Sequence, residues 1–467
     1  MRLVKILFSG IIIENKGGIM IDKKILYYRY NQWWEDDYML NGIIKRPKLI
    51  QKTLPKLESK AILLLTGLRR IGKTTLMRIL IKYLINSKGI NPKNIFYISV
   101  DNYCLKNMSL EEIISEYRKI HRIKSDEKVW LFLDEITVID DFEIQLKNFY
   151  DSYNCKIIAA SSSASLLKTK KDYITGRNSI IEVPPLDFSE YMLFKNIKVK
   201  YADRELLEEY FEDYLKTGGI PEYILNGDID YLRELVDDII RKDIAAVHGI
   251  KNIALLRDYF MLLMERAGKI VSVNKIARIL EISVDTARRY LSFFEDTYLV
   301  YTVNRAGKPN EQLKSPKKIY AADLGIRVMI TGFRDKGSLF ENYIYHKIKS
   351  RNPQYLLENT IEIDFITEDK TLIEAKYYDK LRPKQQELFD KYDAKEKLVI
   401  ASVYDLEIIE GESFHQLLQK RDDLFTNNDL VINSNMIMED ESEYIVEKKK
   451  CINLGRSKTG FIINKPE

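Results

Sequence analysis

The residues from Gly67 to Thr74 have the types and the spacing of a phosphate-binding loop. They read Gly67-x-x-x-x-Gly72-Lys73-Thr74 and stand between an apolar run, 61–65, and a helical pattern. Glycines at these positions let backbone N–H groups converge on phosphate oxygens, and the following helix presents its positive N-terminal end to them. In such a loop the lysine reaches the β- and γ-phosphates, and the threonine hydroxyl binds Mg²⁺. The segment therefore predicts a site for ATP and Mg²⁺.

A second acidic element follows a later apolar run. Residues 129–133 read as a buried strand that ends in Asp134 and Glu135. In P-loop proteins the first acid holds the magnesium ion, directly or through water, and the second is placed to polarise the attacking water. An Asp-Glu pair that only caps a strand is the competing explanation, which the P-loop upstream disfavours. We predict Thr74 and Asp134 as metal-binding residues and Glu135 as a catalytic residue.

A third strand, 156–160, is followed by serines at positions 161–163. Ligands of parallel sheets bind at the carboxyl ends of the strands. A hydroxyl there senses the γ-phosphate, or the serines only cap the next helix, and the sequence leaves both explanations open. The predicted nucleotide contacts are Gly67, Leu68, Arg69, Arg70, Ile71, Gly72, Lys73, Thr74, Thr75 and Ser161.

Another set of charged residues lies in residues 361–376, which read as two short strands around a charged turn. With a turn centred on Asp369, Asp364 pairs with Glu374 and residue 362 with residue 376, so that four charged side chains share one face. Adjacent carboxylates repel unless a cation lies between them, and a lysine nearby can polarise a water beside that cation. The other face is expected to hold Ile361, Ile363, Phe365, Ile373 and Ala375.

Asp364 with Glu374-x-Lys376 has the spacing of a PD-(D/E)xK nuclease core. Glu341, at the edge of the apolar face of a predicted helix, is the acid expected to join it. We predict Glu341, Asp364 and Glu374 as metal-binding residues with Lys376 nearby. The alternative is an exposed strand face with an ion pair between Glu362 and Lys376. Spacing alone leaves both open.

The segments between these two sets of residues are mainly helical. Residues 205–264 have an amphipathic helical pattern that is broken at 218–221, where Gly-Gly-Ile-Pro marks a tight reversal. That reversal is a hinge between the core and its lid, or a purely structural turn. Residues 272–307 predict helix, turn, helix and strand, with Ser272 and Ser283 at helix-start positions.

This order is that of a winged helix-turn-helix. The apolar positions of its second helix are Val284, Ala287, Leu291 and Phe294. Its exposed face presents Asp285, Thr286 and Arg289. Mixed charge is poor for phosphate contact, so DNA binding and protein docking are both retained.

The order of these motifs resembles a known family. The P-loop, "LDEI", the serine-rich strand end, "TGRNSIIEVPPLDFSEY" and "YLKTGGIPEYIL" together resemble the prokaryotic AAA+-type ATPases that have a DUF4143 C-terminal region. The resemblance extends from about Tyr28 to about Leu417. It implies ATPase activity, a winged helix and a C-terminal region similar to PD-(D/E)xK nucleases.

Two features of that family recur here, and one departs. The arginine doublet inside the P-loop is Arg69 and Arg70, and the Gly-Arg before a proline-containing strand ends in Arg177. The resemblance implies that Arg177 is a γ-phosphate sensor or arginine finger. An arginine finger acts across subunits in AAA+ rings, so a homo-oligomer is expected. Action of Arg177 within a monomer is also allowed. The family has Thr-Gly-Ser where this chain has Ala-Ala-Ser161, which weakens a sensor role for Ser161.

Composition limits the remaining possibilities. The chain has 467 residues, 45% of them hydrophobic, and a net charge of +5, which is too small to argue for nucleic acid binding. Cys104, Cys155 and Cys451 are far apart and odd in number, which favours a reducing cytosol over a disulfide framework or zinc ribbon. The apolar run near the N-terminus is too short for a membrane span and is interrupted by Gly10, so neither secretion nor membrane insertion is expected, and Met20 is an alternative start.

The expected fold is α/β, with an AAA+-like P-loop NTPase core around a parallel sheet. The expected segments are an N-terminal extension (1–27), the ATPase core (28–200), a helical lid (201–264), a winged helix-turn-helix (265–312), a restriction-endonuclease-like α/β domain (313–420) and a polar tail (421–467). We expect a cytoplasmic, ATP-binding, Mg²⁺-dependent ATPase coupled to processing of DNA or another nucleic acid. The alternative is a nucleotide-gated protein-interaction switch whose nuclease-like domain is inert.

Overall fold

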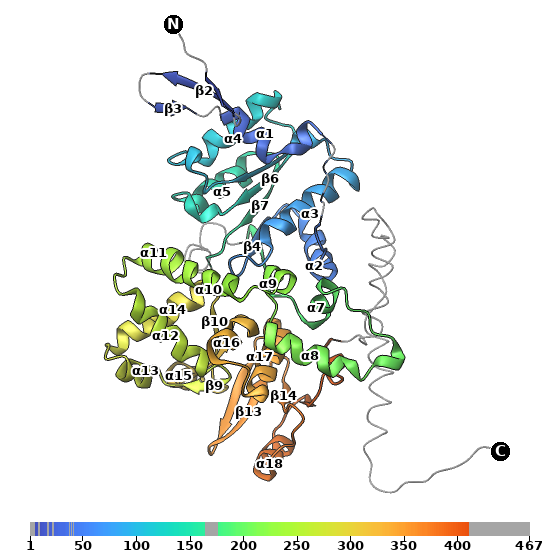
Figure 1. The fold of residues 1–467 in the computed structure, drawn as a ribbon, viewed down its shortest axis with the longest axis vertical. Coiled ribbons are helices and arrows are strands. Elements are labelled where there is room, and N and C mark those ends of the chain that lie inside the picture. The colour runs from blue at the N-terminus through green and yellow to red at the C-terminus, as the bar shows by residue number, and fades with distance from the viewer. Residues whose placement is uncertain are drawn as a thin grey trace, which may run out of the picture.

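The computed structural model of this chain describes residues 5–7, 10–15, 18–20, 23–36, 38, 40, 42–163 and 176–410. The predicted polar tail lies outside these ranges. Figure 1 shows a sheet-centred unit at one end of the molecule, helices in the middle, and a smaller sheet at the other end. None of the helices in these ranges is both long and apolar enough to cross a bilayer.

A five-stranded parallel sheet forms the core of the N-terminal unit. Its strands, in order across the sheet, are β5 (Ile95–Ser99), β6 (Val129–Asp134), β7 (Cys155–Ala160), β4 (Ile62–Thr66) and β8 (Asn178–Glu182). Every residue of β4, β6 and β7 is buried, as expected when helices cover both faces of a parallel sheet. The surrounding helices are α2 (Pro47–Glu58), α3 (Lys73–Asn86), α4 (Leu110–His121) and α5 (Phe142–Ser152). The predicted α/β fold with a parallel core is confirmed.

Residues that precede this sheet in the sequence cover its edge strand, β5. The Asn31 side chain donates to the Tyr97 carbonyl at 2.8 Å and accepts from the Tyr97 N–H at 2.6 Å. The indole N–H groups of Trp33 and Trp34 both donate to the Ile95 carbonyl. These bonds replace those of a neighbouring strand and block edge pairing.

The boundary between the N-terminal extension and the core lies earlier in the chain than predicted. Helix α1 (Lys23–Tyr30) contributes the fully buried Tyr27 to the core, so the core begins before the predicted end of the extension at residue 27. The preceding strands, β1 (Lys5–Leu7), β2 (Gly10–Asn15) and β3 (Gly18–Met20), form a separate antiparallel sheet. Short 3₁₀ turns occur at Gln32–Trp34, Pro92–Asn94, Tyr103–Leu105, Ile136–Val138, Tyr201–Asp203 and Lys349–Arg351.

The middle of the chain is helical, as predicted. Its helices are α7 (Phe188–Phe194), α8 (Leu206–Thr217), α9 (Pro221–Asn226), α10 (Ile229–Asp238), the π-helix η7 (Ile239–Ala245), α11 (Ala246–His248) and α12 (Ile253–Glu265). At the predicted reversal, a Cβ on Gly218 would lie 2.3 Å from the Gly325 nitrogen, and one on Gly219 would lie 2.2 Å from the Leu186 carbonyl oxygen. Three backbone segments therefore meet there at close range, which favours a structural turn over a hinge.

A three-stranded antiparallel sheet follows, in the order β10-β11-β9. Its elements along the chain are β9 (Lys269–Val271), α13 (Val273–Ile279), α14 (Val284–Asp296), β10 (Val300–Val303), α15 (Pro309–Lys314) and β11 (Lys317–Ala321). Ser272 and Ser283 accept hydrogen bonds from the third residue beyond each, so both act as the predicted N-caps. The predicted boundary at residue 312 is wrong, because it separates β11 from both of its partner strands.

The C-terminal part contains a four-stranded sheet in the order β12-β13-β14-β15. Its elements are α16 (Leu324–Thr331), α17 (Lys336–Ile348), β12 (Gln354–Glu358), β13 (Ile361–Ile366), β14 (Thr371–Ala375), α18 (Pro383–Lys391), β15 (Glu396–Ile400) and α19 (Leu406–Glu410). Phe365 pairs with Ile373, which is the register predicted from a turn centred on Asp369.

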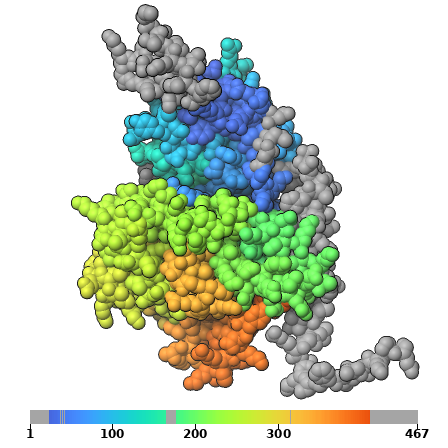
Figure 2. Space-filling model, in the orientation of Figure 1, coloured from blue at the N-terminus to red at the C-terminus, as the bar shows by residue number. Residues whose placement is uncertain are grey.

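The hydrophobic cores do not follow the predicted domain limits. One cluster runs from the parallel sheet through the helices of residues 220–326, and a second joins α7 and α8 to α17 and strands β13 to β15. Figure 2 shows the middle helices, in green and yellow, packed between the blue N-terminal unit and the orange C-terminal part.

Candidate nucleotide site and an acidic cluster

The phosphate-binding loop joins β4 to α3 and requires both of its glycines. Gly67 has φ 132°, and a Cβ there would lie 2.5 Å from the carbonyl oxygen of Val183. Gly72 has φ 99° and is the N-cap of α3, whose first residue is Lys73. Positive φ angles of this kind are strained for residues with a side chain. The helix N-terminus thus follows the loop directly, as an anion site requires.

Thr74 and Asp134, predicted to share a metal ion, are in direct contact. Thr74 Oγ1 donates to Asp134 Oδ2 at 2.6 Å, and the Tyr97 hydroxyl donates to the same oxygen at 3.0 Å. The other oxygen of Asp134 accepts from the Glu135 N–H at 3.1 Å. The carboxylate is 4% exposed, so these bonds fix its orientation at the carboxyl end of β6.

The Lys73 side chain contacts the backbone of the phosphate-binding loop. Its ammonium group donates to the carbonyl oxygens of Gly67 and Leu68, each at 2.9 Å. Burial lowers the pKa of Lys73 to about 8, while Glu135 and Asp134 oppose that change. Thr75 follows in the first turn of α3 and is half-buried.

Glu135 lies beside the serines at the end of β7. Burial raises the pKa of its carboxyl group, and Lys73 opposes that rise. Ser162 Oγ donates to Glu135 Oε2 at 3.3 Å. Ser161 is instead buried and lies 2.9 Å, oxygen to oxygen, from the Thr137 hydroxyl. Ser162, one of the three serines named at this strand end but not a predicted nucleotide contact, therefore contacts the predicted catalytic carboxylate. A sensor role for Ser161 stays a prediction.

Arg177 lies at the opposite end of the sheet from the P-loop. Its carbonyl oxygen accepts from the N–H of Ile62, at the start of β4, whereas the P-loop follows the end of that strand. Five residues of strand span roughly 16 Å. Its guanidinium group donates to Asp151 at 3.1 Å. Action on a phosphate bound by the same chain does not fit this position, and action across subunits stays a prediction.

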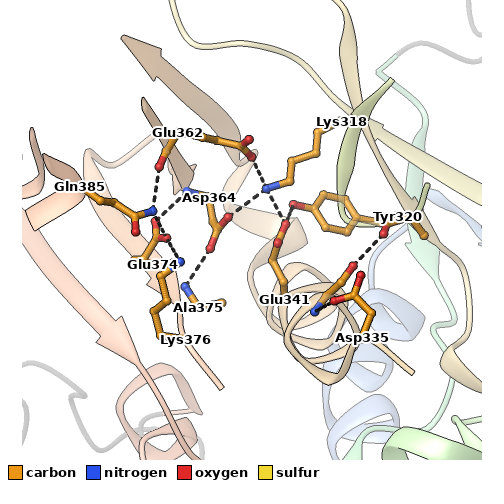
Figure 3. A network of polar contacts seen from close by, with 12 residues as sticks. Lys318, Tyr320, Asp335, Glu341, Glu362, Asp364, Glu374, Ala375, Lys376 and Gln385 are labelled. Atoms are coloured by element: carbon orange, nitrogen blue, oxygen red, sulfur yellow. Dashed lines mark hydrogen bonds and ion pairs between the residues drawn. The ribbon is translucent and has the colours of Figure 1, made fainter. Parts of the chain in front are cut away.

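The charged hairpin meets a residue that the sequence reasoning missed, Lys318 of β11 (Figure 3). The Lys318 ammonium lies 2.6 Å from Glu341 Oε1, 2.5 Å from Glu362 Oε1 and 2.9 Å from Asp364 Oδ1. The side chain is 1% exposed. Tyr320, on the same strand, donates its hydroxyl to Glu341 at 2.6 Å. One lysine therefore stands between the acids predicted to bind a metal ion.

Within the hairpin the acids bond to each other's strands. The Asp364 N–H donates to Glu374 Oε2, and the Ala375 N–H donates to Asp364 Oδ2, both at 3.0 Å. Lys376 pairs with Glu374 at 2.6 Å and not with Glu362. Glu374 and Asp364 are buried, so the alternative of an exposed strand face is wrong.

Burial changes the protonation of this cluster. It raises the pKa of Glu341 to about 8, with Asp364 adding to the rise and Lys318 opposing it. The pKa of Glu374 is raised in the same way, with Lys376 opposing. Burial disfavours the Lys318 ammonium, but Asp364 and Glu341 more than offset this and raise its pKa well above the usual value. The lysine is a permanent cation.

The described residues contain no group of three or more His, Cys, Asp or Glu side chains arranged to hold a metal ion. The predicted metal site at Glu341, Asp364 and Glu374 gains no support, because the Lys318 ammonium occupies the space between two of these acids. A divalent cation beside it would add charge repulsion. No distinctive signal in the sequence marks Lys318, because β11 begins with two adjacent lysines, Lys317 and Lys318, and only the second is buried.

Comparison with known families agrees with the nucleotide-site geometry. Residues 59–192 match a family model described as an AAA domain. This segment is an AAA-type ATPase domain. Residues 208–337 match a domain of unknown function, DUF8612. The AAA+ part of the predicted resemblance is thus confirmed, and the DUF4143 part stays a prediction.

Relatives that match most of this chain are themselves named as uncharacterised proteins. One from Methanocaldococcus jannaschii is 29% identical over 382 residues, covering 77% of this chain and 83% of the relative. Another, from Haemophilus influenzae, is 24% identical over 344 residues, covering 70% of this chain and 84% of the relative.

Solved structures give only remote likeness. AMPPCP-bound DnaA from Aquifex aeolicus is 18% identical with a TM-score of 0.25, covering 56% of this chain and 92% of that one. The S. cerevisiae Hsp104:casein complex is 18% identical with a TM-score of 0.28, covering 55% and 50%. The fold assignment therefore depends on the strand order and the AAA match.

Proposed function

We propose that this chain binds ATP with Mg²⁺ and hydrolyses it. The observation that supports this best is the 2.6 Å contact between Thr74 and the buried Asp134, at the N-terminus of α3 and beside Lys73. A hydroxyl, a carboxylate and a lysine placed in this way match the needs of a Mg²⁺-nucleotide. The AAA match over 59–192 gives independent support.

Each residue has a separate task. The backbone N–H groups of the loop and Lys73 bind phosphate oxygens, and Thr74 with Asp134 would hold the metal ion. Mg²⁺, when bound, neutralises charge on those oxygens. Glu135 orients and polarises the attacking water, and its raised pKa makes it a stronger base than an exposed glutamate. Ser162 holds the Glu135 carboxylate in place.

Phosphate release from ATP tests this proposal. The purified protein with Mg²⁺ should release phosphate well above the rate of a Lys73→Ala variant, which loses the phosphate-binding ammonium. Release no faster than that variant would remove the hydrolysis proposal.

For the C-terminal part, the buried Lys318 favours the nucleotide-gated interaction switch over a metal-dependent nuclease. Its ammonium group pairs with Glu341 and Asp364, two of the three acids that the predicted metal site would use. The exposed face of α14 has both Asp285 and Arg289, which suits protein docking at least as well as DNA. The proposed output of the ATPase is therefore a change in protein contacts.

DNA processing is the competing function, and one comparison separates the two. Plasmid and branched DNA are incubated with Mg²⁺ or Mn²⁺ and either the wild type or Asp364→Ala. The switch predicts no cleavage, or equal cleavage from contaminants. Cleavage by the wild type that Asp364→Ala abolishes would establish the nuclease. Sizing by light scattering with nucleotide tests the homo-oligomer that an arginine finger at Arg177 requires.

A further inference from the structure

Two arginines inside the phosphate-binding loop contact acids from a distant part of the chain. Arg69 Nη1 lies 2.8 Å from Asp243 Oδ1, and Arg70 Nη2 lies 3.5 Å from Asp238 Oδ2. The Arg70 guanidinium also lies over the ring of Tyr231, 5.0 Å from its centroid. All three partners belong to helix α10 and the π-helix η7 that continues it.

The shape of the loop directs both arginines outward. Leu68 and Ile71, on either side of the pair, are buried in the core. Arg70 itself has φ 62°, a left-handed conformation that a residue with a side chain adopts only when its surroundings hold it there. Each arginine side chain is 34% exposed. The loop thus presents two guanidinium groups beside the nucleotide site and toward α10.

The segment that receives them is itself unusual. A π-helix is rare and is frequently found at functional sites. Here it covers Ile239–Ala245 and includes Asp243. Burial raises the pKa of the Asp243 carboxyl group, with Arg69 opposing. Asp238 has a second partner, Lys242, at 2.8 Å. The Asp243 carboxylate therefore depends on Arg69 for charge compensation more than Asp238 depends on Arg70.

A nucleoside triphosphate in the loop would change this balance. Guanidinium groups bind phosphate and carboxylate in the same bidentate geometry, so the two anions are competing partners for one arginine. A carboxylate next to the phosphates would also repel them. The coupling is reciprocal: if the contact between Asp243 and Arg69 weakens phosphate binding by a certain free energy, bound phosphate weakens that contact by the same free energy.

We infer that Asp243 and Asp238 compete with the nucleotide phosphates for Arg69 and Arg70, so that a triphosphate in the loop releases α10 and η7 from it. This inference rests on the proposed ATP binding and adds the route by which the bound nucleotide acts on the 208–337 region. A nucleoside diphosphate lacks the γ-phosphate and therefore competes less with these carboxylates for the two arginines.

Substitution of single carboxylates tests the competition. In Asp243→Asn the competing charge is gone, and the affinity for AMP-PNP with Mg²⁺, measured by calorimetry, should rise at least about fivefold. The matched control is Asp237→Asn, which removes the same charge from the same helix but from a carboxylate paired with Arg241 and Arg257. It should stay within about twofold of the wild type. Unchanged or weaker binding by Asp243→Asn overturns the inference.

Hydrogen exchange on the wild-type protein gives a second readout that needs no variant of this segment. AMP-PNP should speed amide exchange across residues 229–248, and ADP should do so less. Bound AMP-PNP with no change in that segment overturns the inference alone. If the wild type binds no AMP-PNP at all, the proposed ATP binding fails instead, so the two failures are distinct.

Discussion

The ammonium group of Lys318 balances the negative charge of the C-terminal cluster. Three acidic side chains lie within 2.9 Å of it, and two of them, Glu341 and Asp364, are buried. A buried ion pair contributes little net stability, but removal of one partner leaves the other charge uncompensated. The cluster is therefore stable only while this lysine, or another cation, is present.

Lys318→Met should lower the free energy of unfolding by about 3–5 kcal/mol, because it leaves buried carboxylates without their cation. Chemical denaturation measures the change. Lys317→Met is the matched control: that neighbour is 44% exposed, and its loss should cost less than about 1 kcal/mol. Mn²⁺ should restore part of the lost stability to Lys318→Met and add none to the wild type. Equal stability of the two variants would contradict this account.

The protonated state of Glu341 gives stability a pH dependence. Its pKa rises from 4.5 to about 8 on folding, so the folded protein binds the proton more tightly. This contribution is complete below about pH 4.5 and is lost as the pH rises through about 8. Glu341→Gln is permanently neutral, so its Tm should fall less than that of the wild type between pH 6 and pH 9. The exposed Glu358→Gln should behave like the wild type, and identical profiles for all three would exclude this role.

Site residues that belong to a sequence motif could be predicted from the sequence. Site residues that only tertiary packing brings together could not. Thr74, Asp134 and Glu135 follow from motifs in which each residue type has one known task. Lys318 and Asp243 reach their sites only because strands and helices distant in the sequence pack together. Their identity as charged residues gives no indication of that packing.

At the scale of elements, the junction near Gly219 connects the middle helices to the N-cap of α16 and to the segment that contains Leu186. Asp323, the N-cap of α16, accepts from the Gly219 N–H at 2.6 Å, and the Gly219 carbonyl accepts from the N–H of Leu186. No side chain fits between these backbones. The sequence indicated a reversal here from Gly-Gly-Ile-Pro but left open whether it moves. The partners Leu186 and Asp323, which decide the matter, are far away in the chain.

Gly219→Ala should destabilise the protein by about 3 kcal/mol or more, since its Cβ would lie 2.2 Å from the Leu186 carbonyl oxygen. Gly227→Ala is the comparison, because Gly227 has φ 69° and open space around it, so only about 1 kcal/mol of backbone strain is expected. Thermal and chemical unfolding measure both. A Gly219→Ala variant no less stable than Gly227→Ala would mean that the junction can open.

At the scale of the whole molecule, each of the two main hydrophobic cores contains residues from more than one predicted segment. Local patterns located β4, β6 and β7 to within a residue and the caps of α13 and α14 correctly, but the limits at 27 and 312 were wrong. Tyr27 belongs to the sheet core, and β11 pairs with β9 and β10. A continuous core from the parallel sheet to residue 326 provides a physical connection from the nucleotide site to the distal helices.

The central claim is that Glu135 acts on water beside a nucleotide held by the P-loop. Glu135→Gln keeps the shape of the side chain and removes its ability to accept a proton. The affinity of this variant for AMP-PNP should stay within about threefold of the wild type, while its phosphate release from ATP should fall by roughly 10²-fold or more. Undiminished phosphate release by Glu135→Gln would contradict the claim directly.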